Sequence, residues 1–197
     1  MQVSGFGARL RRSRRRAVGA VFAAVCAALA MGAAAAGAGA VVACGGGGLV
    51  LDLGPRVVPK TMELPLLLEL VNRGRAPCTL EGYSRVQLRS SSGALYAFSY
   101  RDHGDAEVTA GRPRLVTLRP GGAAWVLLNK TPCIGNVAGR LARQVWLQAP
   151  ATKGYLRLRL SNVVFFDYCG PGDPGHTIDI SPVEPTAAAT AAPAISS

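Results

Sequence analysis

Residues 85–100 of the chain read RVQLRSSSGALYAFSY, and this stretch decides the fold class. Val86 and Leu88 alternate with polar side chains, which is the period of a strand with one buried and one solvated face. The four residues SSSG at 90–93 then predict a turn, and residues 95–100 predict the hairpin partner. The pattern is typical of antiparallel β-structure.

The same short period recurs after residue 44, where Gly, Pro or Asn interrupts the apolar pattern about every eight to twelve residues. The expected strands, about nine in all, are Leu49–Leu53, Leu66–Val71, Arg85–Arg89, Leu95–Tyr100, Leu115–Leu118, Ala123–Leu128, Val145–Gln148, Leu156–Leu160 and Ile178–Ile180. The sequence therefore predicts an all-β fold, a single antiparallel β-sandwich over residues 44–183. Residues 184–197, rich in Pro, Ala, Thr and Ser, are expected to be a disordered tail.

The first 43 residues have the order of an export signal. Six arginines lie within residues 9–16, and residues 17–43 carry no charge. Arginines, an apolar segment and then small residues predict a signal peptide or membrane-anchor helix that delivers the rest of the chain across the membrane. The residues SRRR at 13–16 also resemble a twin-arginine signal, so two export routes stay open.

Three outcomes are open at the end of this segment. The small residues AGA at 38–40 suit cleavage by a signal peptidase. The residues VVAC at 41–44 resemble a lipobox, which would place a lipid, and with it a membrane contact, on Cys44. Residues 17–43 are also long enough to remain as an uncleaved anchor. Each outcome predicts a location at the extracellular face of the cell envelope, secreted or membrane-anchored.

Four cysteines follow the apolar segment: Cys44, Cys78, Cys133 and Cys169. An even number without a CxxC pair, in an exported chain, indicates two disulfides rather than a zinc site. Three connectivities are possible, and the residues alone do not choose between them. A lipid on Cys44 would leave one thiol unpaired, so parity favours a disulfide there.

The formal net charge of +11 invites a nucleic-acid interpretation, but six of the 22 basic residues belong to the N-terminal segment. Beyond residue 44 the net charge is +5, and the basic residues are scattered singly. A nucleic-acid surface needs a contiguous basic stripe with stacking aromatics, so we expect no nucleic-acid partner. Most of the six aromatic residues considered for a ligand patch are instead expected in the core or in a corner packing: Tyr83, Tyr96, Tyr100, Trp125, Trp146 and Tyr155.

One polar cluster is dense enough to suggest a binding loop, the residues RDHGDAE at 101–107. Asp102, Asp105 and Glu107 offer carboxylate oxygens of the kind that calcium binds, and His103 lies among them. The spacing is not that of an EF-hand, and the preceding arginine compensates the charge locally. We therefore expect a solvated loop and no metal.

No pattern indicates catalysis. Asp167, Asp173 and His176 flank a cysteine, but the surrounding Gly and Pro predict a turn there. The chain has no Gly-x-Ser-x-Gly elbow, no HExxH and no phosphate-binding loop, so we predict a protein that is not an enzyme and that uses no cofactor.

Several landmarks together resemble a known family: Cys44 before LVL at 49–51, LELVNRG at 68–74, CTLEGY at 78–83, LRPG at 118–121, Cys133, and Cys169-Gly170 before IDISP at 178–182. The chain resembles the actinobacterial exported family called domain of unknown function 4232. The resemblance implies an immunoglobulin-like sandwich, the four-cysteine framework and secreted or lipoprotein status. It implies no activity.

We therefore expect an exported cell-envelope β-sandwich that acts as a non-enzymatic binding or structural module, with an unknown protein or envelope ligand as its partner. One alternative is a secreted inhibitor that presents residues 101–112 or 140–143 to an extracellular enzyme. Another is a secreted hydrolase, which would need a nucleophile and a base at a spacing that the sequence does not offer.

Overall fold

The computed structural model describes residues 41–134, 140–162, 164 and 166–193. The predicted export segment, residues 1–43, lies outside these ranges except for its last three residues. The described chain is almost entirely β-structure, which confirms the all-β prediction. Its ten strands are β1 (Leu49–Leu53), β2 (Leu66–Asn72), β3 (Cys78–Leu80), β4 (Arg85–Arg89), β5 (Ser99–Arg101), β6 (Val116–Leu118), β7 (Ala123–Asn129), β8 (Gln144–Gln148), β9 (Leu156–Arg159) and β10 (Thr177–Ile180).

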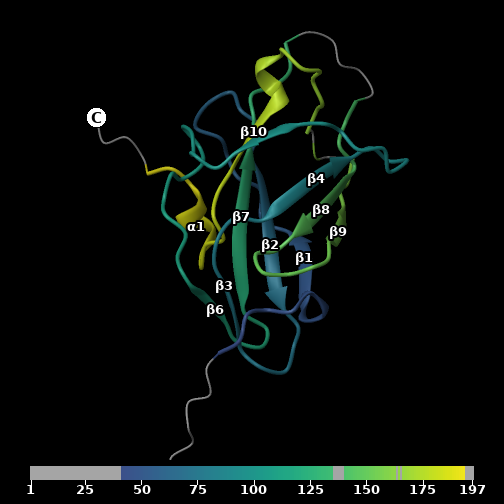
Figure 1. Ribbon diagram of the computed structural model, residues 1–197. Coiled ribbons are helices and arrows are strands. Elements are labelled where there is room, and N and C mark those ends of the chain that lie inside the picture. The colour runs from purple at the N-terminus through teal and green to yellow at the C-terminus, as the bar shows by residue number, and fades with distance from the viewer. Residues whose placement is uncertain (1–40, 135–139, 163, 165, 194–197) are drawn as a thin grey trace, which may run out of the picture. The chain divides into compact units, whose positions relative to one another are not determined.

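Five strands form the largest sheet, in the order β1-β2-β7-β10-β5 (Figure 1). Strands β2 and β7 are its longest members and pair antiparallel, with Leu68 opposite Val126. Strand β2 is buried along nearly its whole length, as the apolar run LLLELV predicts for a central strand. At the far edge, β5 pairs with β10 in parallel.

The other strands form a two-stranded sheet, β3-β6, and a three-stranded sheet, β4-β8-β9, both antiparallel. Figure 1 shows β4, β8 and β9 together to the right of β7. Alternate residues of these three strands point inward and join the main core, while the others face outward. The core thus lies between two sheets, as in a β-sandwich. Fully buried members are Leu68, Leu70, Val126, Leu88, Val145 and Leu147.

Two disulfides close the fold. Cys44 is bonded to Cys78 and Cys133 to Cys169, so each cysteine pairs with its neighbour in the sequence. The first bond fixes the start of the domain to β3. Within the described residues, no helix combines the length and the apolar composition needed to cross a membrane.

The hairpin partner expected at residues 95–100 is only half formed. Leu95 bridges Arg89, and the Tyr96 N–H donates to the Leu88 carbonyl at 3.0 Å. The chain then leaves β4, and residues 99–101 pair with β10 in the other sheet. Phe98 explains the departure, because it is buried with its ring 4.9 Å from that of Tyr168.

The tail is ordered further than its composition predicts. Glu184 exchanges two main-chain hydrogen bonds with Trp125, and a short helix, α1 (Ala187–Thr190), follows. The Glu184 side chain is buried and pairs with Arg114 at 2.7 Å. Main-chain pairing and an ion pair with one buried partner need no large apolar side chains, so composition alone does not reveal these contacts.

Candidate functional site

The acidic loop at 101–107 does not gather its side chains into one site. The Nδ1 atom of His103 lies 3.7 Å from an Asp102 carboxylate oxygen, and both side chains are exposed. The Asp105 carboxylate instead accepts the main-chain N–H groups of Glu107 and Val108, at 2.7 and 2.6 Å. Its second oxygen accepts the Asn129 side-chain amide.

Glu107 is buried, and its carboxylate contacts a different loop. Its Oε1 atom accepts hydrogen bonds from the Lys60 N–H, the Thr61 N–H and the Thr61 hydroxyl, at 2.6 to 3.0 Å. Asp105 and Glu107 therefore hold loops in place. In the described part of the chain, the one trio of potential metal ligands is Cys133, Cys169 and Asp173, and both sulfurs already form a disulfide.

Three polar residues near the second disulfide also have structural partners. The buried Lys130 ammonium donates to Asp167 at 2.6 Å, and burial lowers the pKa of this lysine. Asp173 accepts the Gly175 N–H at the start of a turn, and a ring nitrogen of His176 lies 3.1 Å from the Cys169 carbonyl. The three side chains Asp167, Asp173 and His176 thus support the fold around the disulfide.

A different surface, unnoticed in the sequence, has the features of a binding site. It is the outer face of β4, β8 and β9, here called the arginine face. Its members alternate with the core residues of the same strands: Arg85, Gln87, Arg89, Gln144, Trp146, Gln148, Arg157 and Arg159. None of the three strands contains an acidic residue. The face therefore carries four arginines without a neighbouring carboxylate in these strands.

Trp146 lies at the centre of this face. Arg89 comes from β4 and Arg157 from β9, on either side of β8, and their guanidinium carbons lie 4.0 and 4.1 Å from the centre of the indole ring. Stacking on an aromatic ring is favourable for a guanidinium and leaves its N–H edge free to donate. The ring therefore sets the orientation of two cations. Trp146 is only half-buried, so it is not among the aromatic residues that fill the core.

Hydrogen bonds between side chains hold the face in one arrangement. Arg89 donates to the Gln87 side-chain oxygen at 2.8 Å, and Gln87 donates to the Tyr155 hydroxyl at 3.2 Å. The Trp146 N–H donates to the Gln144 side chain at 3.2 Å. A surface whose side chains already hold each other loses little conformational entropy when it binds.

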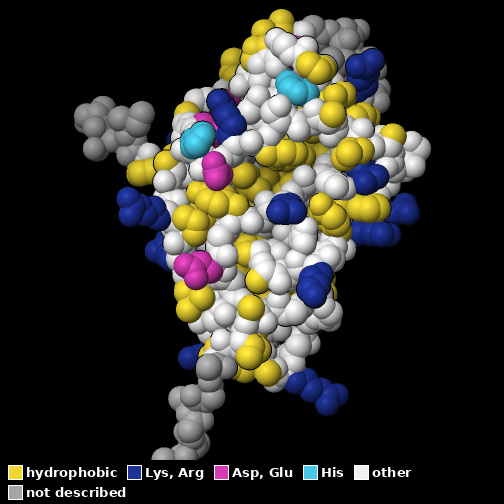
Figure 2. Space-filling model, viewed as in Figure 1, with side chains coloured by type: hydrophobic (Ala, Val, Ile, Leu, Met, Phe, Trp, Pro, Cys, Tyr) yellow, Lys and Arg dark blue, Asp and Glu magenta, His cyan; other side chains and the backbone are white. Residues whose placement is uncertain are grey.

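Three arginines of the face have no such partners. Arg85, Arg157 and Arg159 are exposed and make no hydrogen bond or ion pair within the described residues. Arg159 also lines a polar hollow of about 350 Å³ at the end of the face, together with Arg143 and Asn162. Figure 2 shows dark-blue Lys and Arg side chains along the right-hand side, where Figure 1 places β4, β8 and β9, and no acidic side chain of the described chain there in this view.

Comparison with known proteins places the chain in a family. The family model described as "Domain of unknown function (DUF4232)" matches residues 44–143, about half of the chain. The chain belongs to this family. The DUF4232 match begins at the first disulfide cysteine and runs through β7, ending one residue before β8. No curated protein and no solved structure matches the chain.

The DUF4232 match contains β4 but not β8 or β9, so most of the arginine face lies beyond it. The sequence carried one signal of this face, the alternation of Arg157 and Arg159 with leucines in the strand predicted at residues 156–160. Its significance depends on Trp146 in β8 and on β4, and β4 lies far from β9 in the sequence. Only the strand order brings them together.

Proposed function

We propose that this DUF4232 protein is an exported, non-enzymatic binding module that holds an acidic polysaccharide on the arginine face. The observation that carries the proposal is the set of four arginines around Trp146 in three strands that contain no acidic residue. Isolated surface arginines occur on most proteins. Four arginines on one face, three of them without a hydrogen bond or ion pair in the described chain, indicate a ligand of opposite charge.

The export part of the proposal rests on the disulfides and on the N-terminal sequence. Two disulfides are typical of proteins that work in an oxidising compartment, outside the cytoplasm. The arginine-rich and then apolar order of residues 1–43 is that of an export signal. A ligand of the cell envelope is therefore within reach of the face.

The chemistry of the face suits acidic sugars. A guanidinium donates two parallel hydrogen bonds to a carboxylate, and glutamine amides donate and accept, as sugar hydroxyl groups do. Arg89 and Arg157 both stack close to the centre of the Trp146 ring, and this leaves less of the ring for a nucleobase to stack on. This favours a polysaccharide over a nucleic acid.

The non-enzymatic part rests on the residue types present. The face holds arginine, glutamine and tryptophan, which bind and orient ligands. Its three strands contribute no serine, cysteine, histidine or carboxylate that could act as a nucleophile or a general base.

Calorimetric titration of the full chain, expressed in an exporting host, with polygalacturonate tests the proposal. The double variant Arg157→Gln/Arg159→Gln removes two exposed contacts of about 0.7 kcal/mol each, which corresponds to about a tenfold loss of affinity. The matched control is Arg73→Gln/Arg75→Gln, which makes the same charge change at the same spacing on an exposed turn. We expect the control to bind like the unaltered protein.

Two further ligands complete the design. Dextran, an uncharged polysaccharide, should not bind, and polyphosphate should bind more weakly than polygalacturonate. Equal losses in both double variants would contradict the proposal, because binding would then follow net charge alone. Tighter binding of polyphosphate would replace the acidic sugar with a phosphate polymer.

A further inference from the structure

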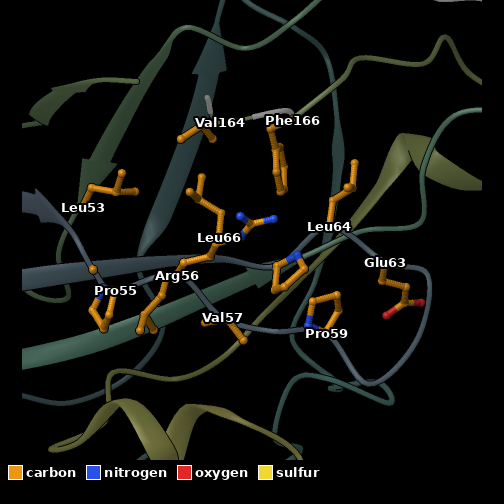
Figure 3. A pocket seen from close by; sticks show the side chains of 13 residues that line it. Leu53, Pro55, Arg56, Val57, Pro59, Glu63, Leu64, Leu66, Val164 and Phe166 are labelled. Atoms are coloured by element: carbon orange, nitrogen blue, oxygen red, sulfur yellow. The ribbon is translucent and has the colours of Figure 1, made fainter. Parts of the chain in front are cut away.

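A second candidate site lies away from the arginine face, where β1 ends and β2 begins. It is a groove of about 400 Å³, within the usual range for small-molecule sites, and we call it the Arg56 groove. Its wall is mostly apolar, with Leu53, Leu64, Leu66, Val164 and Phe166 as members. Figure 3 shows these side chains turned toward the same space.

One cation enters this apolar space. Arg56 comes from the loop between β1 and β2, and its guanidinium points into the groove (Figure 3). It makes no hydrogen bond or ion pair within the described residues. The one carboxylate of the lining, Glu63, accepts a hydrogen bond from the Asn129 amide and points away from Phe166 in Figure 3. The groove thus presents a positive charge without a partner beside an apolar wall.

The loop that carries Arg56 is stiff. Residues 54–65 read GPRVVPKTMELP, and each of the three prolines fixes its own φ. Glu107 holds the middle of the loop through the hydrogen bonds of Lys60 and Thr61. The groove is therefore preformed. Two of the most exposed large apolar side chains of the described chain, Val58 and Met62, belong to the same loop.

We propose that the Arg56 groove binds a monocarboxylate with a single acyl chain. The acyl chain of the ligand would lie against Leu64, Leu66 and Phe166. The ligand carboxylate would accept two hydrogen bonds from Arg56. Charge complementarity selects the head group: one guanidinium matches one carboxylate, whereas a phosphate dianion would leave charge uncompensated. A group the size of a water molecule occupies about 30 Å³. A groove of about 400 Å³ therefore has room for an acyl chain of roughly a dozen carbons.

Titration of the full chain, expressed in an exporting host, with dodecanoate and with dodecanol tests this site. Dodecanoate should bind at least tenfold more tightly than dodecanol, and shortening the acid should weaken binding about fourfold per methylene. Arg56→Gln should lower the affinity for dodecanoate about tenfold and leave that for dodecanol unchanged. Arg119→Gln, which removes an exposed arginine outside the groove, is the matched control.

A second variant tests where the acyl chain of the ligand lies. Leu53 lies at the exposed end of β1, and Leu53→Trp should fill the groove and weaken both ligands. The proposal is overturned if neither ligand binds, if Arg56→Gln binds dodecanoate like the unaltered protein, or if Leu53→Trp changes nothing. A dimer that Leu53→Trp dissociates would also overturn it, because a second copy would then occupy the groove. The variants share no residue with the arginine face, so the two proposals fail separately.

Discussion

Replacing Asp179 with asparagine should stabilise the protein. Asp179 is buried in β10 directly opposite Asn129 in β7, so the two side chains lie side by side on one face of the sheet. One carboxylate oxygen pairs with Arg101, whereas the other, Oδ1, is buried and has no donor among the described residues. The same is true of the Asn129 Oδ1 atom. In Asp179→Asn the new amide can donate to Asn129 while its oxygen still accepts from Arg101.

The expected gain is about 1–2 kcal/mol, the usual cost of a buried polar group that lacks a partner. For a domain of this size, that corresponds to a rise in Tm of about 3–6 °C. Scanning calorimetry of the purified protein measures the change. Asp102→Asn is the control, because it makes the same replacement at an exposed position and should alter the stability by less than about 0.5 kcal/mol.

The gain should depend on pH in a defined direction. Burial raises the pKa of Asp179 above its ordinary value near 3.8, although Arg101 acts in the opposite sense. The folded protein therefore keeps this proton in a pH range where the unfolded chain has lost it, and the stability contribution falls as the pH rises through the folded pKa. Asp179→Asn removes this pH-dependent loss of stability. The variant's gain in Tm over the unaltered protein should therefore be larger at pH 7 than at pH 3.5. A lower Tm at pH 7, or an equal gain at both pH values, would refute the reasoning.

Three further changes test the fold. Replacing Cys44 and Cys78 with serine opens a loop with a sequence separation of 34. The free energy of unfolding should fall by about 3–4 kcal/mol and the Tm measured by calorimetry by about 10 °C. An unchanged Tm would exclude a stabilising role for this bond. Gly175→Ala places a methyl group 2.6 Å from a sulfur of the second disulfide. The free energy of unfolding, measured by urea denaturation, should fall by at least about 2 kcal/mol. An unchanged midpoint of urea denaturation would contradict this packing. Glu107→Ala removes three hydrogen bonds, so amide exchange in residues 54–65 should accelerate at least tenfold, whereas unchanged protection would show that another contact holds the loop.

Local patterns predicted the strands that have one buried face. Arg85–Arg89 and Leu156–Arg159 alternate as expected, because the two-residue period is a property of the strand itself. The three-residue strand Cys78–Leu80 was missed, since it is too short to show a period. In the tail, the described residues 184–193 are held by main-chain pairing, which side-chain composition does not reveal.

The candidate site depends on strand order, which the sequence leaves open. The sequence showed arginines at 85 and 89 and at 157 and 159, but it did not show that β8 lies between them. Trp146 is one of six aromatic residues, most of which were expected in the core or in a corner packing. It lies outward because Val145 and Leu147, its neighbours in β8, take the inward positions. The groove was equally hidden, because Arg56 and Phe166 are 110 positions apart.

The most direct test of the arginine face follows the two indole N–H signals by ¹⁵N NMR during a titration with oligogalacturonate. Trp146 lies at the centre of the face, whereas Trp125 packs against a separate apolar cluster with Leu67 and Leu127. We predict that the Trp146 signal shifts and saturates with the ligand while the Trp125 signal stays in place. A saturating shift of Trp125 alone, or no shift of either signal at ligand concentrations that saturate calorimetric binding, would contradict the assignment of this face as the ligand surface.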